Sequence, residues 1–344
     1  MKKHFAMALA LLLALSVLTV SALAEGKDGE AIGYISFLNL SEEQIMARRA
    51  AERPGREYLR EHGVLEFTDT GLPLNHMVPY DTLDAMLMGL MSGEVKALHV
   101  PDCTAQYLCA ANDQVEQSIL YHPEKAEGFA QELLNALSNG YSFMMLEENS
   151  DLRDQFNQAI AEMKEDGTLD KLIQKYITDA AQSGETEAVE FEQFDGDPIK
   201  VAVTGALPPM DYVAEDGSFA GFNTAILAEI GKRLEKNIDL VQVDSVGRAL
   251  ALAQGNVDAV FWTRAESEGF VNEIVNEGLM TMSEEELEAY IQEIEKSRTV
   301  EENAIINAMR DSLPKGVYKN RDMPEGTIIT SPYYTDLNVL VTLK

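Results

Sequence analysis

The chain has 344 residues and a formal net charge of −31 at pH 7, from 58 acidic and 27 basic side chains. This acidic excess excludes nucleic acids and anionic membrane surfaces as partners, because both are bound through basic patches. With 46% hydrophobic residues, the sequence can form two cores of ordinary domain size.

The first 24 residues have the pattern of an export signal. A basic head at Lys2 and Lys3 precedes an apolar run over residues 5–20, and a small-x-small triplet follows at 22–24. The run is too short for a comfortable membrane span. We expect cleavage after Ala24, no membrane insertion of the mature chain and, because no cysteine follows the run, no lipid anchor. The mature protein is expected in a periplasm or outside the cell.

Strands and helices alternate in the first half of the mature chain, which is typical of an α/β sheet. Residues 41–44 form a capping box that opens a helix, and Pro54-Gly55 predicts a break or offset before its last turn. Residues 151–164 carry the apolar stripe of an amphipathic helix. Further strands are predicted at residues 32–37, 95–100, 115–121 and 141–146, and further helices at residues 83–91, 102–111 and 124–137.

An acidic, glycine-containing stretch over residues 183–197 is predicted to be a linker. A strand, a Pro-Pro turn, a small hairpin and an amphipathic helix follow it over residues 199–234. The remaining predicted elements are a strand at residues 239–243, a helix ending near residue 255, a strand at residues 257–262, an acidic helical insertion over residues 265–325, and a closing segment over residues 326–344.

Two short pieces match each other across the linker. In residues 92–98 and in residues 254–260, a helix ends at a glycine and turns directly into an apolar strand. The same unit in both halves predicts two lobes of similar topology.

Residues 199–234, IKVAVTGALPPMDYVAEDGSFAGFNTAILAEIGKRL, resemble the opening segment of bacterial solute-binding proteins of family 3, the polar amino-acid binders of ABC transporters. Residues 149–177 resemble the closing helices of that family, and residues 326–344 resemble its Phe-Ser-x-Pro-Tyr-Tyr segment and the strand that crosses between lobes. The opening segment therefore follows the closing helices in this chain. The resemblance implies a two-lobe α/β fold of the type II periplasmic-binding-protein kind, circularly permuted, with its new ends at the hinge.

The resemblance also implies the domain boundaries. A lobe 2-like domain with the closing helices occupies residues 25–182, and the linker occupies residues 183–197. A lobe 1-like domain occupies residues 198–344 and contains the acidic helical insertion, residues 265–325, which has only a few counterparts in the family.

The family binds a small polar ligand, usually an amino acid, between its lobes and closes by a hinge motion. The resemblance therefore implies a secreted, non-catalytic protein that captures an amino acid or a derivative and hands it to an ABC permease, with no cofactor. An α-ammonium group needs a buried carboxylate. Asp102 lies at, or one residue from, the aspartate that fills this role in the family, although a helix N-cap role explains Asp102 equally well.

Other site residues follow from the same resemblance. Met210 and Tyr212 match an aromatic wall of the family, with Met210 in place of an aromatic residue. Trp262, the only tryptophan, and Thr263 stand at a strand end that faces the predicted site. These side chains are expected to line the ligand's surroundings.

The carboxylate of an amino acid needs an arginine and helix N-terminal amides. Arg264 directly follows the strand at 257–262, and Arg321 precedes the Ser-Pro-Tyr-Tyr segment. Either arginine is a candidate for the carboxylate, and the alternative that neither reaches the ligand stays open. Asn39 and Ser41 replace the Gly-Thr-Thr helix start of the family and can donate to an anion, although capping alone explains Ser41.

Two other functions stay open at this stage. A dehydratase-like enzyme on the same fold would need an acid–base pair in the cleft, and the sequence shows none. An extracellular sensor would use the acidic insertion as its working surface, with exposed apolar residues on one face. Cys103 and Cys109 are either two free thiols or a disulfide, and the scattered histidines lack the spacing of a metal site.

Overall fold

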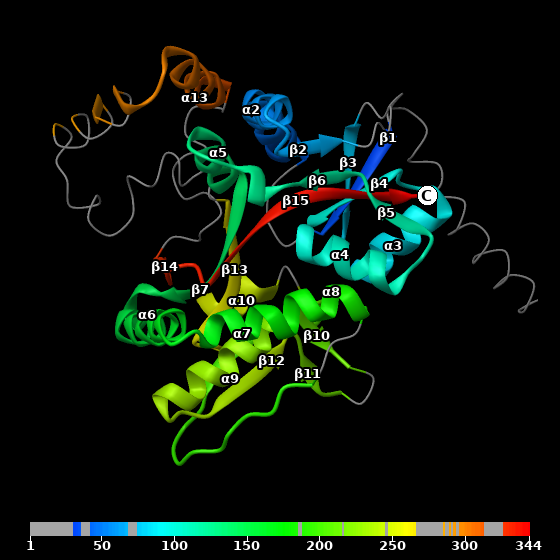
Figure 1. Ribbon diagram of the computed structural model, residues 1–344. Coiled ribbons are helices and arrows are strands. Elements are labelled where there is room, and N and C mark those ends of the chain that lie inside the picture. Colours follow the sequence, from blue (N-terminus) through cyan, green and yellow to red (C-terminus); the bar gives the residue numbers. More distant parts are fainter. Residues whose placement is uncertain are drawn as a thin grey trace, which may run out of the picture.

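The computed structural model of the chain describes residues 30–35, 42–67, 74–184, 188–214, 217–244, 247–265, 285, 289, 292–293, 296–312 and 326–344. The predicted export signal therefore lies outside the described residues. Two lobes lie one above the other, and two long strands cross from one to the other (Figure 1). Each lobe contributes half of one mixed sheet flanked by helices, so the protein has the α/β fold expected from the sequence.

Both halves of the sheet have the same strand order. Lobe 1 has the order β12 (Ile238–Gln242), β8 (Ile199–Val203), β13 (Ala259–Ala265) and β7 (Ser138–Leu146), with β14 (Thr327–Ile329) also paired to β7. Lobe 2 has the order β3 (Leu74–Tyr80), β1 (Glu30–Ile35), β4 (Ala97–Pro101) and β15 (Tyr334–Leu343), with β5 (Val115–Gln117) also paired to β15. In each lobe the first three strands are parallel and the crossing strand is antiparallel to its neighbour. This confirms the prediction of two lobes with similar topology.

Two glycines explain the matching pieces of sequence. Gly93 has φ 79° and ends α3 (Leu83–Ser92) before the chain enters β4. Gly255 has φ 67° and stands between α10 (Gly247–Ala253) and β13. A left-handed residue at this place lets the helix end and the chain turn at once into a strand.

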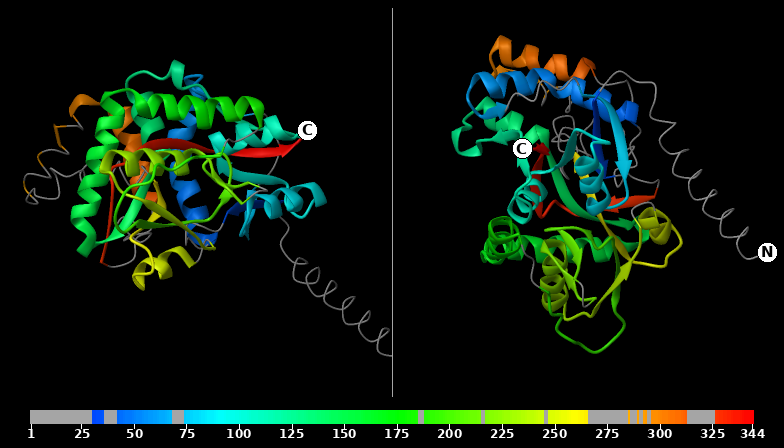
Figure 2. Two further views of the ribbon diagram at one scale, coloured as in Figure 1. Left: turned by 90° about the horizontal axis from the view of Figure 1, so that it is seen from below. Right: turned by 90° about the vertical axis from the view of Figure 1, so that its right-hand side faces the viewer.

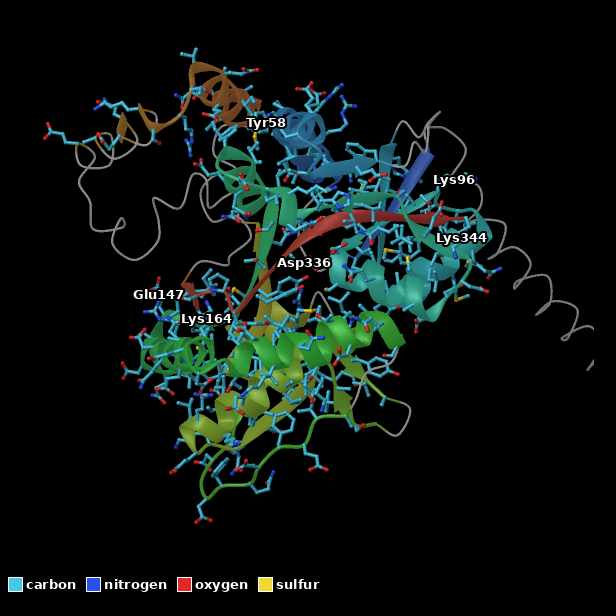
Figure 3. All side chains as sticks on the ribbon, in the orientation of Figure 1. Tyr58, Lys96, Glu147, Lys164, Asp336 and Lys344 are labelled. Atoms are coloured by element: carbon cyan, nitrogen blue, oxygen red, sulfur yellow. The ribbon has the colours of Figure 1, made fainter. Side chains whose placement is uncertain are left out.

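The described ends of the chain lie at the far edge of lobe 2. Strand β15 runs away from the crossing, and Lys344 lies at the outer edge of lobe 2, far from Asp336 at the crossing (Figure 3). Strand β1 begins near the same edge, because Ile32 pairs with Ala97 while the neighbouring Leu98 pairs with Val341 of β15. The prediction that both ends lie at the hinge is therefore wrong. Strand β15 pairs with β7 only over residues 334–337 and then continues to Leu343 along β4 and β5, and β1 is antiparallel to it.

The first two closing helices pack on the lobe that follows them in sequence, and the last one contacts α4 (Asp102–Ala111) of lobe 2. The closing helices comprise α6 (Ser150–Glu165), α7 (Thr168–Ile173), the π-helical turn η4 (Gln174–Asp179) and α8 (Ala180–Ser183). Helices α6 and α7 contact α9 (Phe222–Leu234) of lobe 1. Phe156 and Ile160 of α6 are fully buried in one core with Ile226 and Ile230 of α9, so the apolar stripe predicted for residues 151–164 is confirmed.

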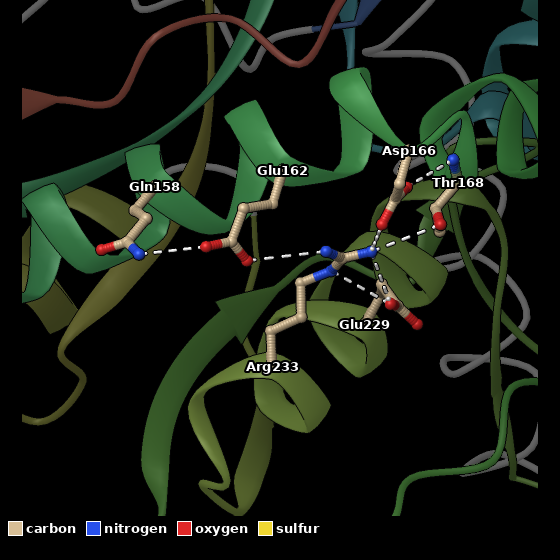
Figure 4. Close-up of polar contacts among 6 residues, drawn as sticks. All are labelled: Gln158, Glu162, Asp166, Thr168, Glu229 and Arg233. Atoms are coloured by element: carbon tan, nitrogen blue, oxygen red, sulfur yellow. Dashed lines mark hydrogen bonds and ion pairs between the residues drawn. The ribbon is translucent and has the colours of Figure 1, made fainter.

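One arginine joins α9 to the closing helices at the surface. The guanidinium of Arg233 contacts Asp166 at 2.8 Å, Glu162 at 3.6 Å and Glu229 at 3.0 Å (Figure 4). The Thr168 hydroxyl and Arg233 hold the pKa of Asp166 well below its usual range. These contacts fix the turn between α6 and α7 on lobe 1.

Helix α2 (Glu42–Glu61) is continuous, so the predicted break at Pro54 is wrong. Proline in a helix removes one backbone hydrogen bond. Here the side chains on both sides of Pro54 are anchored, because Ala51 and Leu59 are both buried. Tertiary packing therefore overrides the local preference.

The other differences are shifts of boundary. Helix α5 (Phe129–Leu137) begins later than predicted, because Gly128 at φ 54° separates it from the short turn η2 (Pro123–Lys125). Strand β3 was not predicted, and β7 starts at Ser138 because its first residues pair with both β13 and β15. The remaining elements are β2 (Leu65–Phe67), β6 (Ile119–Tyr121), the short turn η3 (Glu147–Asn149), β9 (Ala206–Leu207), β10 (Asp211–Val213), β11 (Phe219–Ala220) and α13 (Val300–Ser312). Across the described ranges, every helix is too short or too polar to span a membrane.

Candidate functional site

The carboxyl ends of parallel strands from both lobes meet at the crossing. Asn139 of β7 pairs with Ala265, the last residue of β13, and with Asp336 of β15. Two residues further along β15, Asn338 pairs with Pro101, the last residue of β4. Open α/β sheets bind ligands outside the carboxyl ends of their strands. This junction is therefore the candidate site.

The end of β13 carries three of the predicted ligand-binding residues. Trp262, Thr263 and Arg264 are consecutive in this strand, and Gly140 of β7 pairs with Arg264 on one side and with Thr335 on the other. The fold thus places the backbone of Arg264 one strand away from β15, at the crossing. The side chains of Trp262, Thr263 and Arg264 lie outside the described part of the structure.

Three further predicted residues lie wholly outside the described residues. These are Asn39 and Ser41, between β1 and α2, and Arg321, between α13 and β14. Their roles toward an anion stay predictions.

Asp102 lies at the lobe 2 side of the junction as the first residue of α4. Its carboxylate accepts hydrogen bonds from Gln117 and Gln106, each at 2.6 Å. Burial raises the pKa of Asp102, and the two glutamine bonds act in the opposite direction. The alternative N-cap role is wrong, because Pro101 occupies the N-cap position and Asp102 makes no capping hydrogen bond.

The carboxylate that caps α4 comes instead from the crossing strand. Asp336 accepts a hydrogen bond from the backbone N–H of Cys103 at 3.0 Å and another from the N–H of Leu337 at 2.8 Å. It lies between the two lobes (Figure 3) and is 8% exposed. Burial and the nearby charge of Asp102 raise the pKa of Asp336 to about 7. This role was not predicted from the sequence, because capping residues are expected next to their helix.

On the lobe 1 side, a buried carboxylate organises the turn that follows β8. Asp211 accepts hydrogen bonds from the N–H of Thr204 at 2.8 Å, from the Thr204 hydroxyl at 2.9 Å and from the N–H of Gly205 at 2.5 Å. Burial raises the pKa of Asp211, and these bonds oppose the rise. The network fixes the chain between β8 and β10 at the carboxyl edge of the sheet.

A buried arginine stands beside this carboxylate. Arg248, in the first turn of α10, donates from Nη1 to the carbonyl oxygen of Phe261 in β13 at 2.9 Å. Burial lowers the pKa of Arg248 to about 10, and the charge of Asp211 acts against this. Sequence reasoning missed both residues. The one signal in the sequence that could have pointed to Asp211 and Arg248 is that each is a charged residue within a largely apolar segment.

The two predicted wall residues of lobe 1 differ in position. Met210 is fully buried in the core of lobe 1 and therefore packs inside the lobe instead of lining an open wall. Tyr212 is half-buried on β10, where it pairs with Ala206 of β9. Helix α3 of lobe 2 contacts β9, so Tyr212 belongs to a hairpin at the interface between the lobes.

The structure also describes the two cysteines and the residues that could bind a metal ion. Cys103 is buried and Cys109 is half-buried, and both are free thiols, which decides between the two alternatives left open by the sequence. Burial raises the pKa of both thiols. In the described ranges no group of three or more His, Cys, Asp or Glu side chains is placed to hold a metal ion.

Two lobes with the same strand order, joined by two crossing strands, define a two-lobe α/β fold of the periplasmic-binding-protein type. The sequence pattern of the bacterial extracellular solute-binding proteins, family 3, matches residues 30–179 and 199–268. This match covers more than half of the chain, and the protein belongs to this family. The resemblance noted in the sequence is thereby confirmed.

Several solved structures are similar at low identity. They include the ligand-binding component of an ABC-type import system from Staphylococcus aureus with zinc bound (9% identity, 91% of this chain and 65% of that chain, TM-score 0.35). A second is the BvgS VFT2 domain of Bordetella pertussis (12% identity, 91% of this chain and 80% of that chain, TM-score 0.36). A third is the GluR0 ligand-binding core of Nostoc punctiforme in complex with L-glutamate (11% identity, 92% of this chain and 85% of that chain, TM-score 0.31). The chain spans just under two thirds of the length of the S. aureus protein. No curated protein sequence matches.

Proposed function

We propose that this protein captures a small polar solute, an amino acid or a derivative, between its two lobes without chemical conversion. The observation that carries the proposal is the junction where the ends of β13 and β4 meet on the crossing strands. Membership of a family of extracellular solute-binding proteins supports it. In this proposal Arg264, at the end of β13, receives the ligand's carboxylate, and Asp102 provides negative charge for its ammonium group.

The second part of the proposal concerns chain order. Lobe 2 comes first in sequence, and the closing helices α6 and α7 precede the linker but pack on the lobe that follows it. This order supports a circular permutation of the family arrangement, in which residues 183–197 join the original ends. A permuted chain can keep the fold, because the contacts of each element do not depend on where the chain is opened.

Delivery to an ABC permease and export by the signal at residues 1–24 complete the proposal. Both follow from the family and from the sequence pattern. The sensor alternative gains nothing from α13, whose apolar residues Ile305, Ile306 and Met309 pack on lobe 2 instead of forming an exposed apolar face.

A thermal-shift screen of the purified mature chain tests the function. The probes are the L-amino acids, tested singly at millimolar concentration. A ligand present at 100 times its Kd stabilises the folded state by about 2.7 kcal/mol, which raises Tm by several degrees. We expect one or a few amino acids to do this, with one-to-one binding by calorimetry. If no amino acid shifts Tm and none binds by calorimetry, the amino-acid assignment is wrong.

A further inference from the structure

The last closing helix joins the two lobes outside the crossing strands. Helix α8 contacts α4 of lobe 2, and it lies directly beside that helix in the different views, α8 in green and α4 in cyan (Figures 1 and 2). The elements just before it in sequence, α7 and η4, contact α9 of lobe 1. One helical segment, residues 168–183, is therefore attached to both lobes.

Helix α4 is packed into both hydrophobic cores. Cys103, in its first turn, is 2% exposed and lies in the core of lobe 1 together with Tyr176 and Ile177 of η4. Ala105 and Leu108, further along the same helix, lie in the core of lobe 2. The start of α4 and the turn η4 thus form an apolar contact between the lobes.

At the other end of α4, two backbones approach each other closely. Gly184 ends α8 at φ 67°, and a Cβ atom there would lie 2.9 Å from the Cα and N atoms of Ala111, the last residue of α4. The same atom would lie 3.1 Å from the carbonyl carbon of Ala110. A contact this close needs a residue without a side chain and one defined position of α8 on α4, because packed interiors have few voids.

The two partners in this contact are each fixed to a different lobe. Tyr176 and Ile177 anchor η4, and with it α8, in the core of lobe 1. Helix α4 is anchored in lobe 2 and is also capped by Asp336 of the crossing strand β15, which accepts from the N–H of Cys103. A rotation of lobe 1 about the crossing strands therefore moves η4 and α8 relative to α4.

We infer that the contact of η4 and α8 with α4 is a brace that holds the two lobes in one relative orientation without a ligand. Rotation of the lobes disturbs the burial of Cys103 at one end of the brace and the backbone fit of Gly184 at the other. A contact that is more favourable in one conformation shifts the population toward it. The inference concerns the ligand-free protein and does not rest on the proposed function.

The test measures the distance between the lobes in the ligand-free protein. Spin labels are attached at Lys96→Cys in lobe 2 and Lys236→Cys in lobe 1, both at exposed positions, in a Cys109→Ser background. Cys103 is buried and does not compete for the label. Pulsed electron–electron double resonance then gives the distribution of distances between the two labels.

Three variants of this labelled parent are compared. Gly184→Leu places a side chain against the backbone of α4, and Gly255→Leu is its matched control, because Gly255 also has φ 67° but open space around it. Cys103→Ala adds neither bulk nor backbone strain. It removes the sulfur from the core of lobe 1 and keeps the backbone N–H that donates to Asp336.

We expect one narrow distance distribution for the parent and for Gly255→Leu, and a broader distribution with additional distances for Gly184→Leu. Cys103→Ala should add a smaller fraction of other distances, and it decides the question if Gly184→Leu does not fold. Unchanged distributions in the folded brace variants would overturn the inference. Equal broadening in Gly255→Leu would also overturn it, because backbone strain would then explain the effect. A failed amino-acid screen overturns only the proposed function, since this measurement uses no ligand.

Discussion

Asp336 of the crossing strand β15 accepts a hydrogen bond from the backbone N–H of Cys103, 233 residues away in sequence, and so caps the first turn of α4. This contact joins the strand that connects the lobes to the helix that starts at the end of β4. The Asp336 carboxylate is buried and lies near Asp102, and both its burial and the charge of Asp102 raise the pKa of Asp336. The arrangement makes the stability of the protein depend on pH.

Replacing Asp336 with Asn should remove a specific part of that pH dependence. The folded-state pKa is about 7, above the ordinary value of about 3.9 for aspartate. Between these values the folded state holds a proton that the unfolded state has lost, so the free energy of unfolding falls as pH rises from about 4 to about 7 and then levels off. Urea denaturation of the parent and of Asp336→Asn at intervals across this range should show the difference between them changing by a few kcal/mol. Parallel curves would contradict the assignment.

Gly184→Ala should destabilise the contact between the closing helices and lobe 2. Gly184 ends α8 at φ 67°, and a Cβ atom there would lie 2.9 Å from backbone atoms of Ala111 in α4. The matched control is Gly255→Ala, since Gly255 also has φ 67° but open space around it. Backbone strain alone should cost about 1 kcal/mol in the control, and the clash should add roughly 1–3 kcal/mol at position 184. If chemical denaturation shows equal losses in the free energy of unfolding for both variants, the contact between Gly184 and α4 accommodates the added methyl group and the prediction is wrong.

Arg233→Ala should loosen the closing helices from α9. The guanidinium is 16% exposed and has three carboxylate partners, so its loss leaves a partly screened cluster of negative charge in an acidic protein. We expect a loss of about 1–3 kcal/mol in the free energy of unfolding. Arg53→Ala is the control, because the Arg53–Glu57 pair is exposed at 77% and 53%, and exposed pairs contribute less than about 1 kcal/mol. Similar losses in both variants would argue against an anchoring role for Arg233.

Arg264→Ala and Arg321→Ala address the anion-binding group. A buried ligand carboxylate needs a positive partner, and the loss of that partner costs on the order of 2–5 kcal/mol, which is about a thirtyfold rise in Kd or more. We expect Arg264→Ala to show this rise in calorimetry with an amino acid found by the thermal-shift screen, and Arg321→Ala to bind nearly as the parent does. The backbone of Arg264 is tied to a buried strand at the crossing. If both variants bind the amino acid as the parent does, another group holds its carboxylate and the assignment to Arg264 is wrong.

Several features were predictable from the sequence because they depend on neighbours within a few residues. The apolar stripe of α6 follows from a spacing of three and four residues. The turns at Gly93 and Gly255 follow from the need for a left-handed residue between a helix and a strand. The repetition of that unit in both halves was enough to predict two similar lobes. The sequence also determined the family, because its motifs are local.

Only the tertiary structure decided the contacts between distant segments. Asp336 caps α4, Asp211 lies beside Arg248, and Ile306 enters the core of lobe 2 although its flanking strands belong to lobe 1. Strand order and register bring these residues together, and neither is encoded within a short window of sequence. A buried carboxylate or a docked helix is stable only when the groups around it are in place, so these parts of the protein follow from the assembled fold.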